Sequence, residues 1–357
     1  MQHEKLHRSD IETRLYEGHE LDQHLPRLQQ FVNEQGQLTP SSRLVWLKIL
    51  QAGLKQRPYL LEAVRAGRAV GLLPLMFVES LLFGRFLVGM PYLNSGGVVA
   101  VDAAAATALI DRAVALADAL RVKHLELRHE RGRRHPAFNY EAGGKLHMRL
   151  DLPRSADELW SQFDPKVRNQ IRKGEKSGLT VAWGGLERVD DFYRVFSRNM
   201  RDLGTPVFSR ELFRQMLLQF KADAEICLLY RERQPVSGAV LLHGVGVTEV
   251  PSASTLRKFN STNANMLMYW RLLQRAIARG QHTFDFGRSS EGSNTYRFKK
   301  QWGAHPEPAL WQYYVRSGNV AAMRPDSPRN QRLIQLWKRL PPPLANWLGP
   351  PIVRGIP

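Results

Sequence analysis

Residues 283–304 read TFDFGRSSEGSNTYRFKKQWGA, a stretch in which a polar loop joins a strand pattern to a helix pattern. The first four residues have the apolar character of a buried strand, interrupted only by Asp285. The loop that follows is rich in glycine and serine, and the short helix after it carries Tyr296, Lys299 and Lys300. Because a rigid strand positions what the next loop presents, charged groups at a strand end are typical of a functional site. We therefore expect the chemistry of the chain here.

The polar residues of this stretch have two interpretations. In the first, Asp285 is a proton acceptor, while Arg288, Ser289, Tyr296 and Lys300 bind and orient a substrate. A lysine in this position could stabilise a developing oxyanion or hold a phosphate. In the second, which we weigh equally, Asp285 and Arg288 form a structural ion pair.

Outward from this stretch, the second half of the chain repeats the order of elements expected in the first half. The first half predicts a strand, two helices, three strands, a helix and a strand, at Ile11–Tyr16, Leu21–Glu34, Ser42–Lys55, Tyr59–Val64, Ala69–Phe77, Leu81–Val88, Asp102–Leu120 and Lys123–Arg128. The second half predicts helices and strands in a similar succession, at Leu159–Ser177, Leu179–Trp183, Val189–Leu203, Arg210–Lys221, Ala224–Arg231, Val236–Leu242, Val245–Pro251, Asn263–Arg279 and Thr283–Phe286. Two similar successions indicate a tandem duplication of one α+β fold.

The segment 164–178 is a second candidate site because cations crowd one short helix. Asp164 can cap it, Pro165 suits its first position and Gly178 can end it, while Val167 and Ile171 are spaced to point inward. The polar faces carry Lys166, Arg168, Asn169, Arg172, Lys173 and Lys176. We expect Arg168, Asn169, Arg172 and Lys173 to bind the phosphates of a substrate. The alternative is an ordinary solvated helix face.

Two further segments contribute candidate binding residues. Met200–Arg210 turns at Gly204-Thr205-Pro206 between two helices, and we expect Arg201 to border the site, although a purely structural turn explains the segment equally well. Asn263 and Asn265 precede Tyr269 near the start of the long helix. We expect Asn265 and Tyr269 to contact a ligand, and we weigh helix capping by the asparagines above this.

Composition bounds the class of protein. The 357 residues, 43% of them hydrophobic, suffice for two cores, and 51 Lys and Arg against 33 Asp and Glu give a net charge of +18 that should attract polyanions. The single cysteine, Cys227, excludes an internal disulfide. No metal-ligand spacing, H-E-x-x-H, G-x-S-x-G or P-loop motif occurs, so we expect no metal site and no cofactor. No apolar leader or membrane-spanning stretch is evident, so we expect a cytoplasmic protein.

The absence of glycine between Gly246 and Gly280 also disfavours acetyl-CoA as a donor in the second half, since backbone N–H groups approach a pyrophosphate closely only at glycine. The pattern divides the chain into a tail at 1–9, a first domain at 10–150, a second domain at 151–318 and a basic, proline-rich tail at 319–357. Within this last tail, Leu333, Ile334, Trp337 and Leu340 share one helical face. That face is expected either to dock on the protein or to make a peripheral contact with the inner membrane surface.

The segments quoted above, and especially Asp285–Ser289 with Tyr296–Ala304, resemble FemAB-like GNAT proteins, and within them the subgroup that accompanies exosortase/PEP-CTERM exopolysaccharide clusters. The resemblance covers most of residues 10–345 and implies two GNAT (acyl-CoA N-acyltransferase) folds packed as one unit. It also implies transfer of an amino acid from aminoacyl-tRNA to an amine of a peptidoglycan precursor. The lysine of the family's Tyr-x-Phe-Lys segment, which is important in its active cleft, corresponds here to Lys299.

The resemblance thus predicts an acyltransferase in which Lys299 is catalytic, and whose partners are a phosphorylated cell-wall or exopolysaccharide precursor and aminoacyl-tRNA. The residues themselves add Asp285 as the second catalytic candidate, a proton acceptor. Two alternatives from other classes remain. The net charge of +18 is also typical of a non-catalytic RNA-binding protein. The apolar face of the last tail would also suit a membrane-surface scaffold of polysaccharide assembly.

Overall fold

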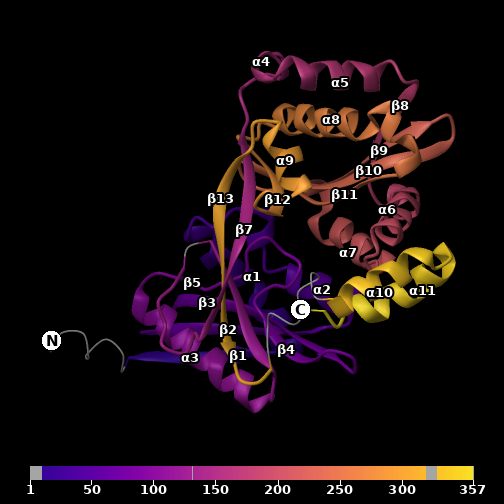
Figure 1. Cartoon of the computed structure of the whole chain (residues 1–357). Coiled ribbons are helices and arrows are strands. Elements are labelled where there is room, and N and C mark those ends of the chain that lie inside the picture. The colour runs from indigo at the N-terminus through magenta and orange to yellow at the C-terminus, as the bar shows by residue number, and fades with distance from the viewer. Residues whose placement is uncertain (1–9, 131, 319–327, 357) are drawn as a thin grey trace. The chain divides into compact units, whose positions relative to one another are not determined.

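The computed structural model describes residues 10–130, 132–318 and 328–356, and these form two compact units (Figure 1). Unit 1 contains the described residues up to Gly144, the segment from Pro308 to residue 318, and the described residues from Arg354 onward. Unit 2 contains Lys145–Glu307 and the two helices that lie between residues 328 and Val353. The sequence alone groups residues 308–318 with the second domain, whereas the structure places them in unit 1.

The described residues of unit 1 form a sheet covered by three helices. Its strands lie in the order β1-β2-β3-β4-β6-β13, with the short β5 beside β3. The strands are β1 (Ile11–Tyr16), β2 (Arg57–Arg65), β3 (Arg68–Ser80), β4 (Gly84–Val88), β5 (Val99–Ala100), β6 (His124–His129) and the part of β13 (His305–Val315) that lies in this unit. The helices are α1 (Gly18–Glu34), α2 (Trp46–Leu54) and α3 (Ala103–Ala119). The predicted cap of the last is confirmed, because the Asp102 carboxylate accepts a hydrogen bond from the Ala105 N–H.

Unit 2 has its own sheet, in the order β7-β12-β11-β10-β9-β8. The strands are β7 (Tyr140–Asp151, which enters from unit 1), β8 (Leu179–Gly184), β9 (Ala224–Arg231), β10 (Gln234–His243), β11 (Val247–Thr255) and β12 (Thr283–Ser290). The helices are α4 (Ala156–Gln162), α5 (Pro165–Glu175), α6 (Val189–Leu203), α7 (Arg210–Phe220), α8 (Ala264–Ala278), α9 (Asn294–Lys300), α10 (Pro328–Arg339) and α11 (Pro342–Val353).

The layers of unit 2 follow from the burial pattern of its helices. Residues Met266–Trp270 of α8 are all buried, because α8 is enclosed between the sheet on one side and α5 on the other (Figure 1). The close approach of α5 needs Gly174, since a Cβ there would lie 2.8 Å from the Leu267 Cβ. On the opposite face of the sheet, α6 and α7 form a layer, and α10 and α11 pack against α6.

Both units repeat one topology, which makes the fold a tandem α+β duplication, as the sequence predicts. In unit 1 the last strands are an antiparallel β3–β4 pair and a parallel β4–β6 pair, with α3 preceding β6 in the chain. In unit 2 the corresponding pairs are an antiparallel β10–β11 and a parallel β11–β12, with α8 between the parallel strands in sequence. A parallel pair requires such a crossover connection.

Three local predictions differ from the structure. The single helix predicted over Leu159–Ser177 is wrong: Phe163 and Asp164 are extended, and α5 starts afresh at Pro165, because a proline favours an extended conformation in the residue before it. The strands β7 and β13 were not predicted. Gly143 and Gly144 weaken the strand pattern of β7, and Pro306 and Pro308 weaken that of β13.

Among the described helices, none combines the length and the apolar character that crossing a bilayer requires.

Candidate functional site

The residues quoted from 283 to 304 build a junction at the end of a strand. The parallel pairing of β12 with β11 ends at Asp285, opposite Glu249, and the register of β12 against β7 shifts between Asp285 and Arg288. Gly287 provides the positive φ of 75° that the bulge uses. Its N–H donates to the Asp285 Oδ1 at 2.6 Å, which fixes the carboxylate inside the turn. Strand β12 therefore stops pairing with β11 at its buried acidic residue, Asp285.

Helix α9 returns a lysine to this bulge. The Ser293 hydroxyl caps the helix by accepting from the Tyr296 N–H, and the cap sets the direction of the next turn. The Lys299 Nζ donates to the Gly287 carbonyl at 3.1 Å and to the Arg288 carbonyl at 2.8 Å, and the side chain is 8% exposed. An ammonium group has three N–H donors, so one remains for a further acceptor.

Burial sets the protonation of this lysine. Desolvation lowers the pKa of Lys299 to about 8, the Arg288 cation lowers it as well, and the Asp285 carboxylate opposes them. With a pKa of about 8 the ammonium group is still ~90% protonated at pH 7. It loses its proton at a lower pH than an exposed lysine, whose pKa is about 10.4. The site thus holds a cation from which water is largely excluded, which strengthens its attraction for a developing negative charge.

A second cation at the junction was not anticipated from the sequence. Arg149 of β7 lies 3.4 Å from the Asp285 Oδ2 through its Nε, and its Nη1 donates to Glu307 at 2.6 Å. Both carboxylate oxygens of Asp285 are therefore engaged, one by a backbone N–H and one by a guanidinium. In the sequence, Arg149 is a charged residue between the apolar Met148 and Leu150. This pattern indicates a functional position only if β7 is recognised as a strand.

The structure brings most of the predicted strand-end residues together. Arg288 is half-buried and Ser289 is 4% exposed, with a hydroxyl that has no hydrogen-bond partner among the described residues. Tyr296 is half-buried on α9, and the Lys300 ammonium lies 5.8 Å from the centre of its ring. A guanidinium does pair with Asp285 in the structure, and it is that of Arg149.

The cationic segment 164–178 lies elsewhere in unit 2. Val167 and Ile171 point inward as predicted, and the Asp164 side chain caps the helix. Asn169, Arg172 and Lys173 are exposed and Arg168 is half-buried, on a helix that α8 separates from the sheet. No hydrogen bond joins these side chains to Lys299, whose ammonium donates to the carbonyls of Gly287 and Arg288.

The Arg172 guanidinium lies 5.4 Å from the ring centre of Trp160, and its Nη1 lies 3.4 Å from the Asn169 Oδ1. These contacts leave the charge of Arg172 without a carboxylate partner among the described residues. The predicted phosphate-binding role of the α5 cations thus stays open to a ligand from solvent.

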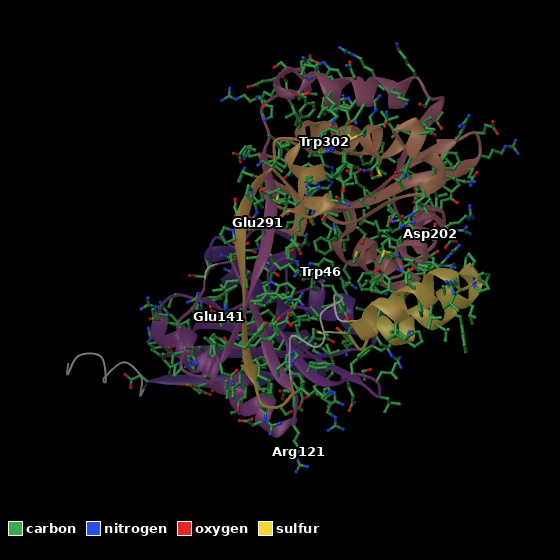
Figure 2. All side chains as sticks on the ribbon, in the orientation of Figure 1. Trp46, Arg121, Glu141, Asp202, Glu291 and Trp302 are labelled. Atoms are coloured by element: carbon green, nitrogen blue, oxygen red, sulfur yellow. The ribbon has the colours of Figure 1, made fainter. Side chains whose placement is uncertain are left out.

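The remaining candidates have structural contacts. Arg201 lies at the end of α6, where it donates to the Lys338 carbonyl of α10 and pairs with Asp202. Asn265 accepts from the Thr255 hydroxyl of β11, so it joins helix and strand without capping. Tyr269 is buried, stacks on Phe286 and packs near Trp302, which Figure 2 labels below α8. A ring so enclosed contributes to packing.

The described part of the chain contains no cluster of three or more histidine, cysteine or acidic side chains placed to hold a metal ion. Cys227 is buried in β9, and desolvation raises the pKa of its thiol. What the junction does supply is a positively charged donor, the Lys299 ammonium, held in a partly desolvated place.

Comparisons with known proteins place the fold in a known class. Residues 161–300 match the family model described as an acetyltransferase (GNAT) domain. No curated protein matches the chain. Among solved structures, the chain is similar to FemX at 16% identity and a TM-score of 0.55, over 83% of this chain and 94% of that one.

Two other solved structures have a similar fold. L-PGS from Bacillus licheniformis gives 13% identity and a TM-score of 0.54, over 88% of this chain and 97% of that one. A tandem GNAT protein from the clavulanic acid biosynthesis pathway gives 11% identity and a TM-score of 0.56, over 87% and 99%. The fold is thus a tandem GNAT fold, and the match at 161–300 covers the helix with the exposed cations, β12 and Lys299.

Proposed function

We propose that the protein is an acyltransferase that moves an acyl or aminoacyl group from an activated ester onto an amine or hydroxyl of a peptidoglycan or exopolysaccharide precursor. The observation that carries the proposal is Lys299, a buried ammonium with two backbone acceptors and one N–H to spare at the end of β12. The GNAT match at 161–300 and the FemAB-like Tyr296–Lys299 segment support the reaction class.

In the proposed reaction the acceptor atom attacks the ester carbonyl, and the carbonyl oxygen gains negative charge in the tetrahedral intermediate. The third N–H of Lys299 would donate to that oxygen or to the departing ester oxygen. The C–O bond of the ester then breaks, the leaving oxygen takes a proton, and the acceptor loses one. Arg288, Ser289, Tyr296 and Lys300 would orient the acceptor, since they lie on the same strand end and helix.

Asp285 has a supporting role in this proposal. Both of its oxygens are engaged, by the Gly287 N–H and by Arg149, which leaves it poorly placed to take a proton from the acceptor. Its negative charge instead raises the pKa of Lys299 and keeps the ammonium charged. We therefore assign Asp285 to positioning and charging Lys299.

The donor proposed is aminoacyl-tRNA or another activated ester, with the exposed cations of α5 binding its phosphates. Asn169, Arg172 and Lys173 point into solvent, as a polyanion site requires. The same face also supports the second candidate function, a non-catalytic RNA-binding protein. A membrane-surface scaffold is the remaining alternative. The transferase is favoured because neither alternative needs a buried lysine with a lowered pKa.

The test is a transfer assay followed by mass spectrometry of the acceptor. Cell-wall and exopolysaccharide precursors are incubated with the protein and either aminoacyl-tRNA or acetyl-CoA, and the products are searched for the mass of the added group. We expect product with the wild type and a loss of about 10²–10³-fold in kcat for Lys299→Ala. Arg297→Ala, an exposed cation on the same helix, is the matched control and should retain full activity.

Wild-type turnover by a folded Lys299→Ala protein would remove the lysine from the mechanism. Tight RNA binding with a steep salt dependence, together with no transfer to any precursor, would favour the RNA-binding alternative.

A further inference from the structure

A cavity of about 840 Å³ lies on the α6 side of the unit 2 sheet, away from α8. It is enclosed by α6, the start of α7, the start of β10, the segment after β11 and the start of α11. Its charged lining consists of Arg194, Arg198, Arg210, Arg257 and Lys258 against Asp190 and Asp202. Five cations thus face two carboxylates.

The carboxylates of the lining are already paired, which leaves part of the positive charge uncompensated. Asp190 accepts from Arg210 at 2.9 Å, and Asp202 lies 3.5 Å from Arg198. Arg257 is exposed and has no ion pair or hydrogen bond to its side chain among the described residues. The Lys258 ammonium contacts an amide oxygen, that of Gln234, at 3.2 Å. Arg257 and Lys258 therefore offer two unpaired charges to an anion in the cavity.

The rim of this cavity is apolar and exposed. Trp347 of α11 lines the cavity while 74% of its surface is open to solvent, and Leu344, three residues earlier on the same helix face, is 40% exposed. On α10, outside the lining of the cavity, Leu333 and Leu336 share a face at the same spacing and are 55% and 59% exposed. Large apolar side chains at this exposure forgo part of the stabilisation that burial would give.

The two helices are held firmly in this position. A Cβ on Gly204 would lie 2.6 Å from an Ile334 methyl group, and one on Gly349 would lie 2.8 Å from Val207, so both helices approach the α6–α7 layer closely. The Asn346 amide donates to the Ser197 hydroxyl at 3.3 Å. Figure 2 labels Asp202 at the end of α6, next to the α10–α11 pair. The face predicted from Leu333, Ile334, Trp337 and Leu340 is thus divided: Ile334 docks, and Leu333 stays outside.

We propose that this cavity and its rim form a peripheral membrane site, in which Arg257 and Lys258 hold the phosphate of an anionic phospholipid and Trp347 and Leu344 enter the bilayer interface. An indole has an apolar body and one polar N–H, which suits the headgroup region, and basic side chains are attracted to an anionic leaflet. The proposal does not depend on the acyl transfer. Exposed leucines gain nothing from a nucleic acid strand, so a bilayer explains the rim better than RNA does.

The experiment is flotation of the full-length protein with vesicles of phosphatidylcholine, or of phosphatidylcholine with 30% phosphatidylglycerol. We expect binding to the anionic vesicles and at least tenfold less to the neutral ones. Arg257→Glu with Lys258→Glu should reduce binding to anionic vesicles by at least tenfold. Arg68→Glu, an exposed cation of unit 1, should bind as the wild type does.

Trp347→Ser tests the apolar rim separately, because it leaves every cation in place. It should weaken flotation severalfold, while Trp347→Phe, which keeps an aromatic ring, should retain more binding than Trp347→Ser. Quenching of tryptophan fluorescence by brominated lipid should fall in Trp347→Phe relative to the wild type.

Four outcomes would overturn the proposal. The first is no flotation with either vesicle, and the second is flotation that the double charge reversal leaves unchanged. The third is displacement of the wild type from vesicles by tRNA together with loss of tRNA binding in the double charge reversal, which would assign the cavity to RNA. Equal binding of glycerol 3-phosphate by the wild type and Trp347→Ser, without flotation, would assign it to a soluble phosphate.

Discussion

Each unit ends a parallel strand pair at a buried carboxylate, but the two units surround that carboxylate differently. In unit 1, the pairing of β4 with β6 ends at Glu126, which lies 2.6 Å from Arg128 of the same strand. In unit 2, the pairing of β11 with β12 ends at Asp285, whose guanidinium partner comes from another strand, through Arg149 at 3.4 Å. The buried carboxylate is thus compensated in unit 1 by an arginine two residues along the same strand, Arg128. In unit 2 it is compensated by Arg149, which is distant in sequence and lies on a neighbouring strand.

The segment just beyond each carboxylate differs further. In unit 1, the backbone of Gly96 exchanges hydrogen bonds with the backbone of Arg128, at 2.9 and 3.4 Å, and this pairing occupies the strand end. In unit 2, the carbonyls of Gly287 and Arg288 accept from the Lys299 ammonium. A backbone bridge cannot change its charge, whereas an ammonium can. The duplicated junction is therefore closed by backbone pairing in unit 1, whereas in unit 2 it presents an ammonium group that a reaction could use.

The largest expected effect is on the free energy of unfolding, which should fall more when Arg128 is replaced than when Arg149 is replaced. Arg128→Met would leave the buried Glu126 carboxylate without its guanidinium partner, with only the Tyr313 hydroxyl still bonded to it, which should cost about 3–5 kcal/mol of unfolding free energy. Arg149→Met should cost less, about 1–3 kcal/mol, because Arg149 is partly exposed and Lys299 remains near Asp285. Calorimetric unfolding of both variants measures the difference. An equal or larger cost for Arg149→Met would contradict the distinction between the two junctions.

A smaller effect concerns the charge on Lys299. The Asp285 carboxylate raises the pKa of this lysine against the opposing effect of burial, so Asp285→Asn should move the pKa of Lys299 below about 8. The amide oxygen can still accept from the Gly287 N–H, so the turn should persist. Titration of ¹³C-labelled lysine by NMR measures the shift.

Glu307→Gln is the matched control for that titration, because Glu307 contacts Arg149 and not Lys299. It should leave the lysine titration where it is in the wild type. A downward shift as large as that of Asp285→Asn would show that the charge on Arg149, and not Asp285, governs Lys299.

The smallest expected effect tests the backbone of the bulge. Gly287→Ala places a side chain at a φ of 75°, which should cost about 1–2 kcal/mol, and it should also displace the carbonyl that Lys299 uses. Gly292→Ala, at a φ of 70° in the open loop, should cost about the same and retain transfer activity. Unfolding and transfer assays on the pair separate backbone strain from displacement of Lys299, and equal activities would contradict a role for the bulge.

Much of this junction could be predicted from the sequence, because its signals are local. The strand at 283–286, the loop and the Tyr296–Lys299 helix follow from periodicity and turn residues, and the order of elements predicts the duplication. Arg149 could not be predicted, because its contact with Asp285 joins residues 136 apart on a strand that Gly143 and Gly144 conceal. Likewise, nothing local indicates that α8 lies between α5 and the sheet, since that order of layers is set by packing.

The pH dependence of kcat for acyl transfer, measured in the wild type and in Lys299→Arg, tests whether the reaction needs the charged lysine. If the charged lysine is required, activity of the wild type should be constant below the pKa of Lys299 and fall as the pH rises through about 8, where the ammonium loses its proton. Lys299→Arg keeps its charge at all these pH values, so its remaining activity should show no such fall. A wild-type rate that stays level up to pH 10 would contradict the account.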